Sequence, residues 1–150
     1  MKTSFASIFL TTAALMSSAM ASPTFDVVEA RGNNPLPDKD KPYICNTQSN
    51  SAGTSNIKEA LNKLQKIDKG CAPGKDGKAV WMVKDDGVKL FIGSTGGQQT
   101  GNFDCKDLVT PFQLLLDYCA GNVAGDYRAG GAAWVPGYEG RTYVYPTNHE

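Results

Sequence analysis

The chain has very little of what catalysis usually requires. Its 150 residues include a single histidine, His149, next to the C-terminus, and no Cys-x-x-Cys pair. A serine or cysteine hydrolase needs an oriented general base, and a zinc site needs clustered thiolate and imidazole ligands. His149 lies in a polar tail that would do little to orient it. We therefore expect no catalytic triad, no metal site and no cofactor, and we interpret the protein as a non-enzyme.

The chain also lacks net charge. Its 15 basic residues balance its 15 acidic ones, so no overall field attracts nucleic acid or an anionic membrane. The longest apolar run, residues 5–16, is too short to span a bilayer. No Asn-x-Ser/Thr sequon is present. Nucleic-acid binding, a membrane anchor and N-glycosylation are therefore not expected.

The N-terminus has the pattern of a targeting segment. Lys2 precedes the apolar run, and the small residues Ala19 and Ala21 follow it. This pattern predicts a secretory signal peptide over residues 1–21, and hence an extracellular protein. Residues 22–31 end in Arg31 and are interpreted as a propeptide, with a simple tail as the alternative reading.

The remaining chain is long enough for one small domain and one core. Residues 32–42 hold three prolines and four charges with almost nothing apolar, which predicts a flexible leader. Residues 43–150 then form a single domain, expected to be a monomer.

The order of periodic segments predicts an α+β fold. Apolar residues recur at helical spacing after Asn56, with Ser55 as the alternative cap, as far as about Lys69. They recur again over 104–119, where Pro111 predicts a break or kink. Expected strands are 43–45, 79–83, 88–92 and 141–145, with a further short piece near Trp134. This order is the split β-α-β pattern of a two-layer sandwich, an antiparallel sheet with both helices on one face.

Four cysteines in a small secreted chain predict two disulfides, with zinc as the competing interpretation. Spacing alone permits three pairings. In the expected layout the first helix begins near the end of the first strand, and the second helix runs antiparallel to the first. The end of the first helix then lies beside the start of the second, and the end of the second helix lies beside the end of the first strand. That direction predicts the pairs Cys45–Cys119 and Cys71–Cys105.

Asp86-Gly87 is a strong two-residue hairpin signal between the two central strands. A regular register pairs Val83 with Leu90 and Trp81 with Ile92. It places Trp81 in the core and leaves the opposite face uncovered. Together with the loop 73–78, that face is the predicted binding surface, with the leader covering it as the alternative. The predicted binding residues are Lys75, Lys78, Met82, Lys84, Lys89 and Phe91.

Other motifs have simpler interpretations. Asp85-Asp86 resembles a glycosidase carboxylate pair but sits in the turn, and Gly93–Gly97 lacks the lysine of a phosphate loop. A sugar-stacking platform is a further possibility, although the same aromatics are the ordinary content of a terminal strand and its approach. Its residues would be Trp134, Tyr138, Tyr143 and Tyr145.

Part of the chain resembles the virally encoded killer toxin of smut fungi and related secreted proteins. The resemblance covers the stretch from Cys105-Lys106-Asp107-Leu108 to Cys119, the glycine-rich gap after it and the closing segment Gly140–Tyr145. Cys71-Ala72-Pro73-Gly74 is similar to the toxin's basic loop, although that loop has more basic residues and the toxin more cysteines. The resemblance implies a secreted effector or toxin acting on another cell, in the toxin's case on calcium channels. It also associates a basic residue near Lys78 with activity.

Fungal necrosis-inducing effectors are similar in their four cysteines and glycine-rich C-terminal part. The expected partner is thus a protein of a target or host cell. Alternative functions are a small secreted hydrolase or nuclease, or an inhibitor or carbohydrate-binding module.

Overall fold

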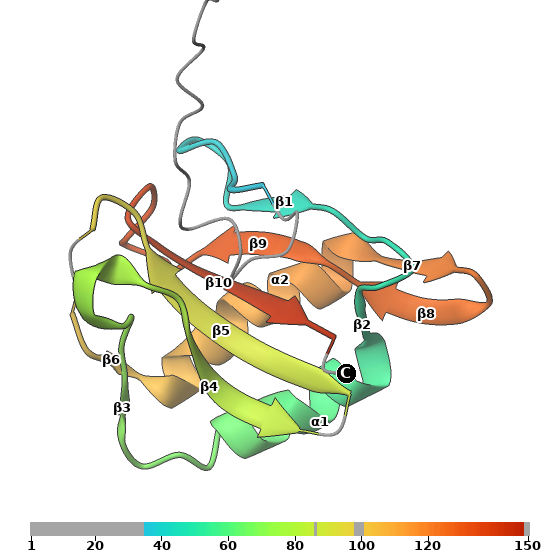
Figure 1. Cartoon of the computed structure of the whole chain (residues 1–150), viewed down its shortest axis with the longest axis horizontal. Helices are drawn as coiled ribbons and strands as arrows, with labels where there is room; N and C mark the ends of the chain where they lie inside the picture. The colour runs from blue at the N-terminus through green and yellow to red at the C-terminus, as the bar shows by residue number, and fades with distance from the viewer. Residues whose placement is uncertain (1–34, 86, 98–100, 149–150) are drawn as a thin grey trace, which may run out of the picture.

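The computed structural model describes residues 35–85, 87–97 and 101–148, and Figure 1 shows how its elements are arranged. The predicted signal peptide and propeptide, as well as His149, lie outside these ranges. Among the described residues, no helix is long and apolar enough to cross a membrane. The helical elements are α1 (Thr54–Leu64), η2 (Lys75–Gly77), η3 (Cys105–Leu108) and α2 (Val109–Cys119).

The main sheet has five strands in the order β1-β9-β10-β5-β4, and every neighbouring pair is antiparallel. β5 and β9 therefore run in the same direction, with α2 between them in the chain and β10 between them in the sheet. This is a split β-α-β unit, and the α+β prediction is confirmed. The five strands are β1 (Tyr43–Cys45), β4 (Val80–Asp85), β5 (Val88–Ser94), β9 (Gly131–Trp134) and β10 (Thr142–Thr147).

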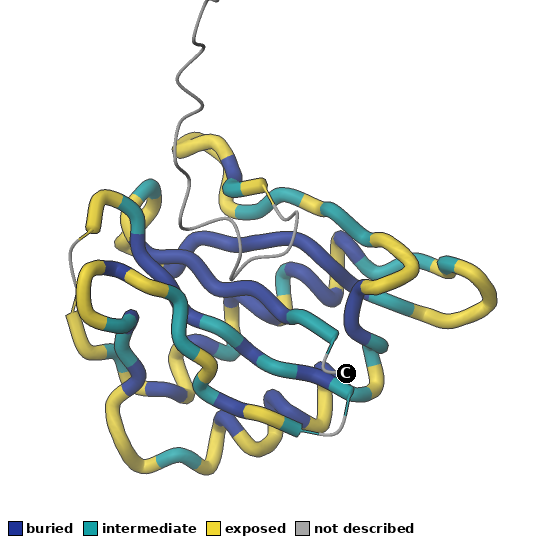
Figure 2. The backbone as a smooth tube through the Cα atoms, viewed as in Figure 1, coloured by how far each residue is buried: buried dark blue, intermediate teal, exposed yellow. Residues whose placement is uncertain are grey.

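Both long helices lie on one face of this sheet (Figure 1). The apolar stripes of α1 and α2 are buried there against the inward side chains of the strands, and Figure 2 shows the buried centre. Burial of this layer is the main stabilising contribution to the fold. Its largest fully buried helix residues are Ile57, Leu64, Leu108, Phe112 and Leu115.

The predicted second helix is divided as expected, but earlier than Pro111. A 3-10 turn, η3, covers Cys105–Leu108, and the α-helix begins at Val109. Pro111 then lies in the first turn of α2, where a backbone N–H would have no partner within the helix, so its absence costs little. Asp104 caps η3 by accepting a hydrogen bond from the Lys106 backbone at 3.2 Å.

The first helix begins and ends earlier than predicted. α1 follows Gly53, without a side-chain cap from Ser55 or Asn56, and stops at Leu64 rather than near Lys69. After the helix, Gly70–Cys71 forms β3, which pairs with β6 (Phe103–Asp104) beside the second disulfide.

The region after α2, where no strand is expected from the sequence, is a β-hairpin. β7 (Ala120–Val123) and β8 (Asp126–Ala129) pair around Ala124 and Gly125, and β2 (Ala52–Gly53) adds a third strand. Both turn residues have positive φ, 54° and 91°, the backbone of the tight turns that suit hairpins. Alanine rarely adopts positive φ, so the turn is difficult to predict from the sequence.

Both predicted disulfides are present. Cys45 is bonded to Cys119 and Cys71 to Cys105, with Cα–Cα distances of 5.1 Å in each pair. They attach the two ends of the η3–α2 segment to β1 and to β3. The helix directions inferred from the sequence therefore suffice to select this pairing from the three that spacing allows.

The β4–β5 hairpin departs from the predicted register by one bulge. Val83 pairs with Leu90 as expected, but Trp81 pairs with Phe91 instead of Ile92, so Met82 is an extra residue on β4. Upstream of the bulge, the side chains of β4 point to the sheet face opposite to the one predicted. Trp81 is 58% exposed on the face away from the helices, and Met82 packs against the core between sheet and helices. The predictions for these two side chains are therefore wrong.

We expect replacement of either cysteine pair by alanine to lower the free energy of unfolding by about 4 kcal/mol, because each bridge restricts a long loop of the unfolded chain. Urea unfolding of each double variant measures the loss. Mass spectrometry of unreduced peptides checks the pairing itself, and a peptide joining Cys105 to Cys119 would contradict the structure.

The bulge predicts that the two tryptophans differ in accessibility. Trp81 is 58% exposed, whereas Trp134 is 4% exposed. Iodide should therefore quench the fluorescence of a Trp134→Phe variant strongly and that of a Trp81→Phe variant weakly. Equal quenching, or the reverse order, would restore the regular register with Trp81 in the core.

Candidate binding surface on the outer face of the sheet

The sheet face opposite α1 and α2, called here the outer face, presents a row of aromatic side chains across three strands. The backbone register aligns Trp81 of β4 with Phe91 of β5 and Phe91 with Tyr145 of β10. The Phe91 and Tyr145 rings stack with centroids 5.0 Å apart and planes 8° apart. Tyr145 is fully buried and Phe91 partly buried, so Trp81 at the sheet edge is the accessible end of the row.

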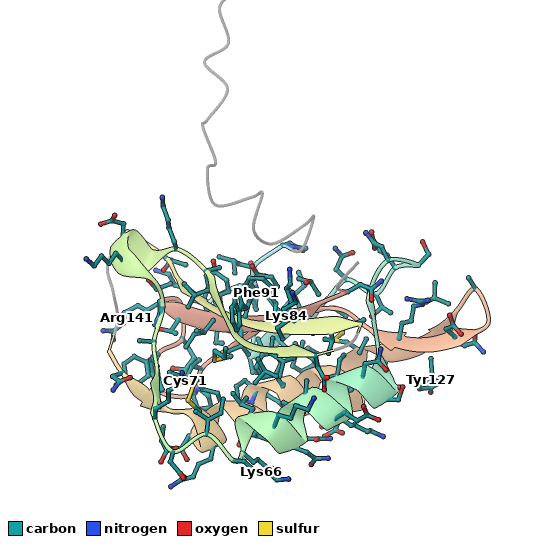
Figure 3. The ribbon with its side chains drawn as sticks, turned by 60° about the horizontal axis from the view of Figure 1, so that its bottom comes forward. Lys66, Cys71, Lys84, Phe91, Tyr127 and Arg141 are labelled. Atoms are coloured by element: carbon teal, nitrogen blue, oxygen red, sulfur yellow. A yellow bond between two sulfur atoms is a disulfide. The ribbon has the colours of Figure 1, made fainter. Side chains whose placement is uncertain are left out.

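A second row carries positive charge and lies two residues away along β5 and three residues away along the bulged β4. Lys84 of β4 is directly opposite Lys89 of β5. Both alternate with inward-facing core residues and so point to the outer face. Figure 3 shows Lys84 beside Phe91 on the side of the sheet away from α1. Trp81, Lys84, Lys89 and Phe91 are called the outer hairpin surface from here on.

The two lysines carry the same charge and therefore repel each other. Like charges directly opposite on one sheet face destabilise the pairing. None of the ion pairs found among residues 35–85, 87–97 and 101–148 involves Lys84 or Lys89. The nearby Asp85 carboxylate accepts from Lys63 of α1 at 2.6 Å, which draws it toward the helix layer. An anion bound at the outer face would relieve the repulsion.

The leader covers a different part of the outer face. Leu36 packs against the cluster around Trp134, Tyr143 and Tyr145. The Trp134 ring N–H donates to the Asp38 carbonyl at 3.1 Å, and its backbone N–H donates to the Pro42 carbonyl at 2.9 Å. The predicted cover by the leader thus applies to β9 and β10, while Trp81 and Lys84 on β4 stay exposed.

The proposed sugar platform is not accessible as a unit. Trp134, Tyr143 and Tyr145 are buried, and the exposed Tyr138 packs edge-on against Phe103 at 4.8 Å instead. The phenol of Tyr143 lies over Gly93, where a Cβ would come within 2.6 Å of its oxygen. These rings support the sheet and the leader.

The predicted basic loop lies apart from the lysine pair. Lys75 and Lys78 are exposed around η2, which is closed by a hydrogen bond from the Gly74 N–H to the Lys78 carbonyl at 2.8 Å. Lys78 precedes β4, and Lys84 is near its far end. Six extended residues span about 20 Å, so the two lysines do not form one site. Of the predicted residues, the structure brings together Lys84, Lys89 and Phe91.

Sequence reasoning missed Trp81 as a surface residue. An apolar residue alternating with Val83 is normally assigned to the core, and bulges have no strong local signature. The sequence did hold one indication of the correct face. Val80 and Met82 are both apolar and alternate with Trp81, so they could have been assigned to the core in its place.

Two surface hollows are lined in part by charged residues that pair with each other. A hollow of about 340 Å³ beside β3 and β6 is lined in part by Asp104 and Lys106, whose side chains pair at 2.7 Å. The hydrogen bond from the Lys106 side chain lowers the pKa of Asp104, and the same bond raises the pKa of Lys106. A larger hollow, about 500 Å³, adjoins the start of α1 and Arg128, which pairs with Asp126 at 2.7 Å. The described residues contain no group of three or more potential metal ligands.

Comparison with known proteins identifies no relative. No protein-family model matches the chain, and no curated protein or solved structure matches it either. The outer hairpin surface therefore has to be interpreted from its own residues.

We expect Lys84→Glu to raise the free energy of unfolding by about 0.2–1 kcal/mol, because it converts a like-charge pair into an opposite one. The double variant Lys84→Glu/Lys89→Glu restores a like-charge pair and should unfold near the wild-type urea midpoint. Lys58→Glu, on the exposed side of α1, is the control for a charge change elsewhere. Destabilisation by Lys84→Glu alone would show that Lys84 is compensated in the native fold.

Proposed function

We propose that the protein is a secreted, non-enzymatic binding protein that acts on another cell as an effector or killer-toxin-like protein, and that it does so through the outer hairpin surface. The observation that carries this proposal is an exposed indole on the same sheet face as two opposed lysines that form no ion pair with any described residue. Trp81 is 58% exposed, and apolar side chains rimmed by charge are typical of partner sites.

This arrangement does not stabilise the free protein. A large exposed apolar ring leaves apolar area in water, and the lysine pair weakens its own hairpin. Neither feature stabilises the free protein, whereas a partner that covers the ring and neutralises the ammonium groups would gain from both. The killer-toxin resemblance suggests a membrane protein of the target cell, such as a calcium channel.

The two disulfides support the secreted part of the proposal, since such bonds persist in oxidising compartments. The enzymatic alternative has less support, because Asp85, one of the two adjacent carboxylates, is paired with Lys63 at 2.6 Å. Loss of a turnover activity on His149→Ala would revive that alternative.

The test applies purified mature protein to plant tissue and to competing fungal cells, with binding, cell death and growth arrest as readouts. Lys84→Glu/Lys89→Glu should reduce binding at least tenfold, because the surface charge is reversed while the fold is kept. Lys58→Glu/Lys66→Glu changes the net charge equally on the helix side and should bind like wild type. Equal binding by both double variants would show that another surface is used.

A further inference from the structure

We infer that the outer hairpin surface, on which the proposed function also rests, binds an acidic polysaccharide, with a sugar ring on Trp81 and its carboxylates on Lys84 and Lys89. The ligand class is a chain of uronic acids, which carries a flat apolar ring face and a negative charge on every unit. Both features have a counterpart on this surface.

The aromatic half of the surface is suited to stacking. Trp81 shows no ring contact among the described residues, although its row neighbours Phe91 and Tyr145 stack on each other. One indole is thus left free on an otherwise filled aromatic row. A free flat ring on a rigid support can pack against the C–H face of a pyranose without reorganisation.

The charged half indicates an acidic ligand. Lys84 and Lys89 form the next row, which lies two residues or about 7 Å from Phe91 along β5 and three residues from Trp81 along the bulged β4. That separation is on the scale of one sugar unit with its carboxylate. Two ammonium groups side by side would donate hydrogen bonds to carboxylates of successive units, and a neutral glycan would leave their repulsion in place.

The form of the surface favours a polymer over a buried small molecule. The two hollows described above lie elsewhere, beside β3 and β6 and at the start of α1. No residue of the outer hairpin surface lines either of them. An extended chain can cross such an open surface and contact both rows at once.

The bulge argues against an acidic peptide as the occupant. β4 is the edge strand, and a peptide would add to it through a regular ladder of backbone hydrogen bonds. The extra residue Met82 interrupts that edge, and bulges are a common device that prevents strand addition. A polysaccharide needs only the side chains of Trp81, Lys84 and Lys89. An anionic bilayer is disfavoured by the net charge of zero.

The experiment measures binding of the mature protein to polygalacturonate, to its methyl ester and to polyglutamate. The methyl ester keeps the sugar rings and removes the charge, while polyglutamate keeps the charge and removes the rings. Wild type should bind polygalacturonate at least tenfold more tightly than either probe, and added salt should weaken that binding.

Two variants separate the contributions of the ring and the charges. Lys84→Glu/Lys89→Glu should lose at least tenfold in affinity for polygalacturonate, with Lys58→Glu/Lys66→Glu as the charge-matched control. Trp81→Ser should lose at least threefold for polygalacturonate and nothing for polyglutamate. Tyr127→Ser, at an exposed aromatic of β8 that is 62% accessible, is its control and should bind like wild type.

Equal affinity for polyglutamate, or for vesicles of phosphatidylcholine and phosphatidylserine in equal amounts, would overturn the inference, as would full affinity in Trp81→Ser. The proposed function fails separately. If the lysine variant loses cell binding while wild type ignores polygalacturonate, the polysaccharide is wrong and the surface stands. If polygalacturonate is bound but no cell is, the ligand stands and the action on cells is wrong.

Discussion

The fold depends on the segment η3–α2 being held at both ends. Cys105 joins its start to β3, and Cys119 joins its end to β1. Between these bonds the apolar side chains Leu108, Phe112 and Leu115 have only one direction in which to be buried, toward the sheet. The sheet must therefore offer its inward face to α2 and, next to it, to α1.

One-sided packing determines where a binding surface can be. Because both helices cover the same face, the other face of the five-stranded sheet has to be covered by something else or stay in water. The leader covers β9 and β10 through Leu36 and the hydrogen bonds of Trp134. The hairpin β4–β5, at the edge of the sheet, is the part where an exposed tryptophan and a lysine pair remain together.

Prediction from sequence succeeded where the signal was local and repeated. The helical stripes, the Asp-Gly turn with its pairing of Val83 and Leu90, and the direction of the helices were sufficient for the fold class and for both disulfides. It failed where one residue changed the outcome. Alanine at positive φ concealed the β7–β8 turn, and the extra residue Met82 exchanged the faces of Met82 and Trp81.

The sequence by itself determined the α+β class, the two cysteine pairs and the positions of Lys84, Lys89 and Phe91, because alternation and helical period are properties of neighbouring residues. Only the tertiary structure decided that Trp81 joins them, that Lys75 and Lys78 stand apart, and that the leader leaves β4 uncovered. Those outcomes depend on a bulge and on packing between distant segments. A side chain's face in a strand reverses with a shift of one residue, and the energies that place the shift come from contacts remote in the chain.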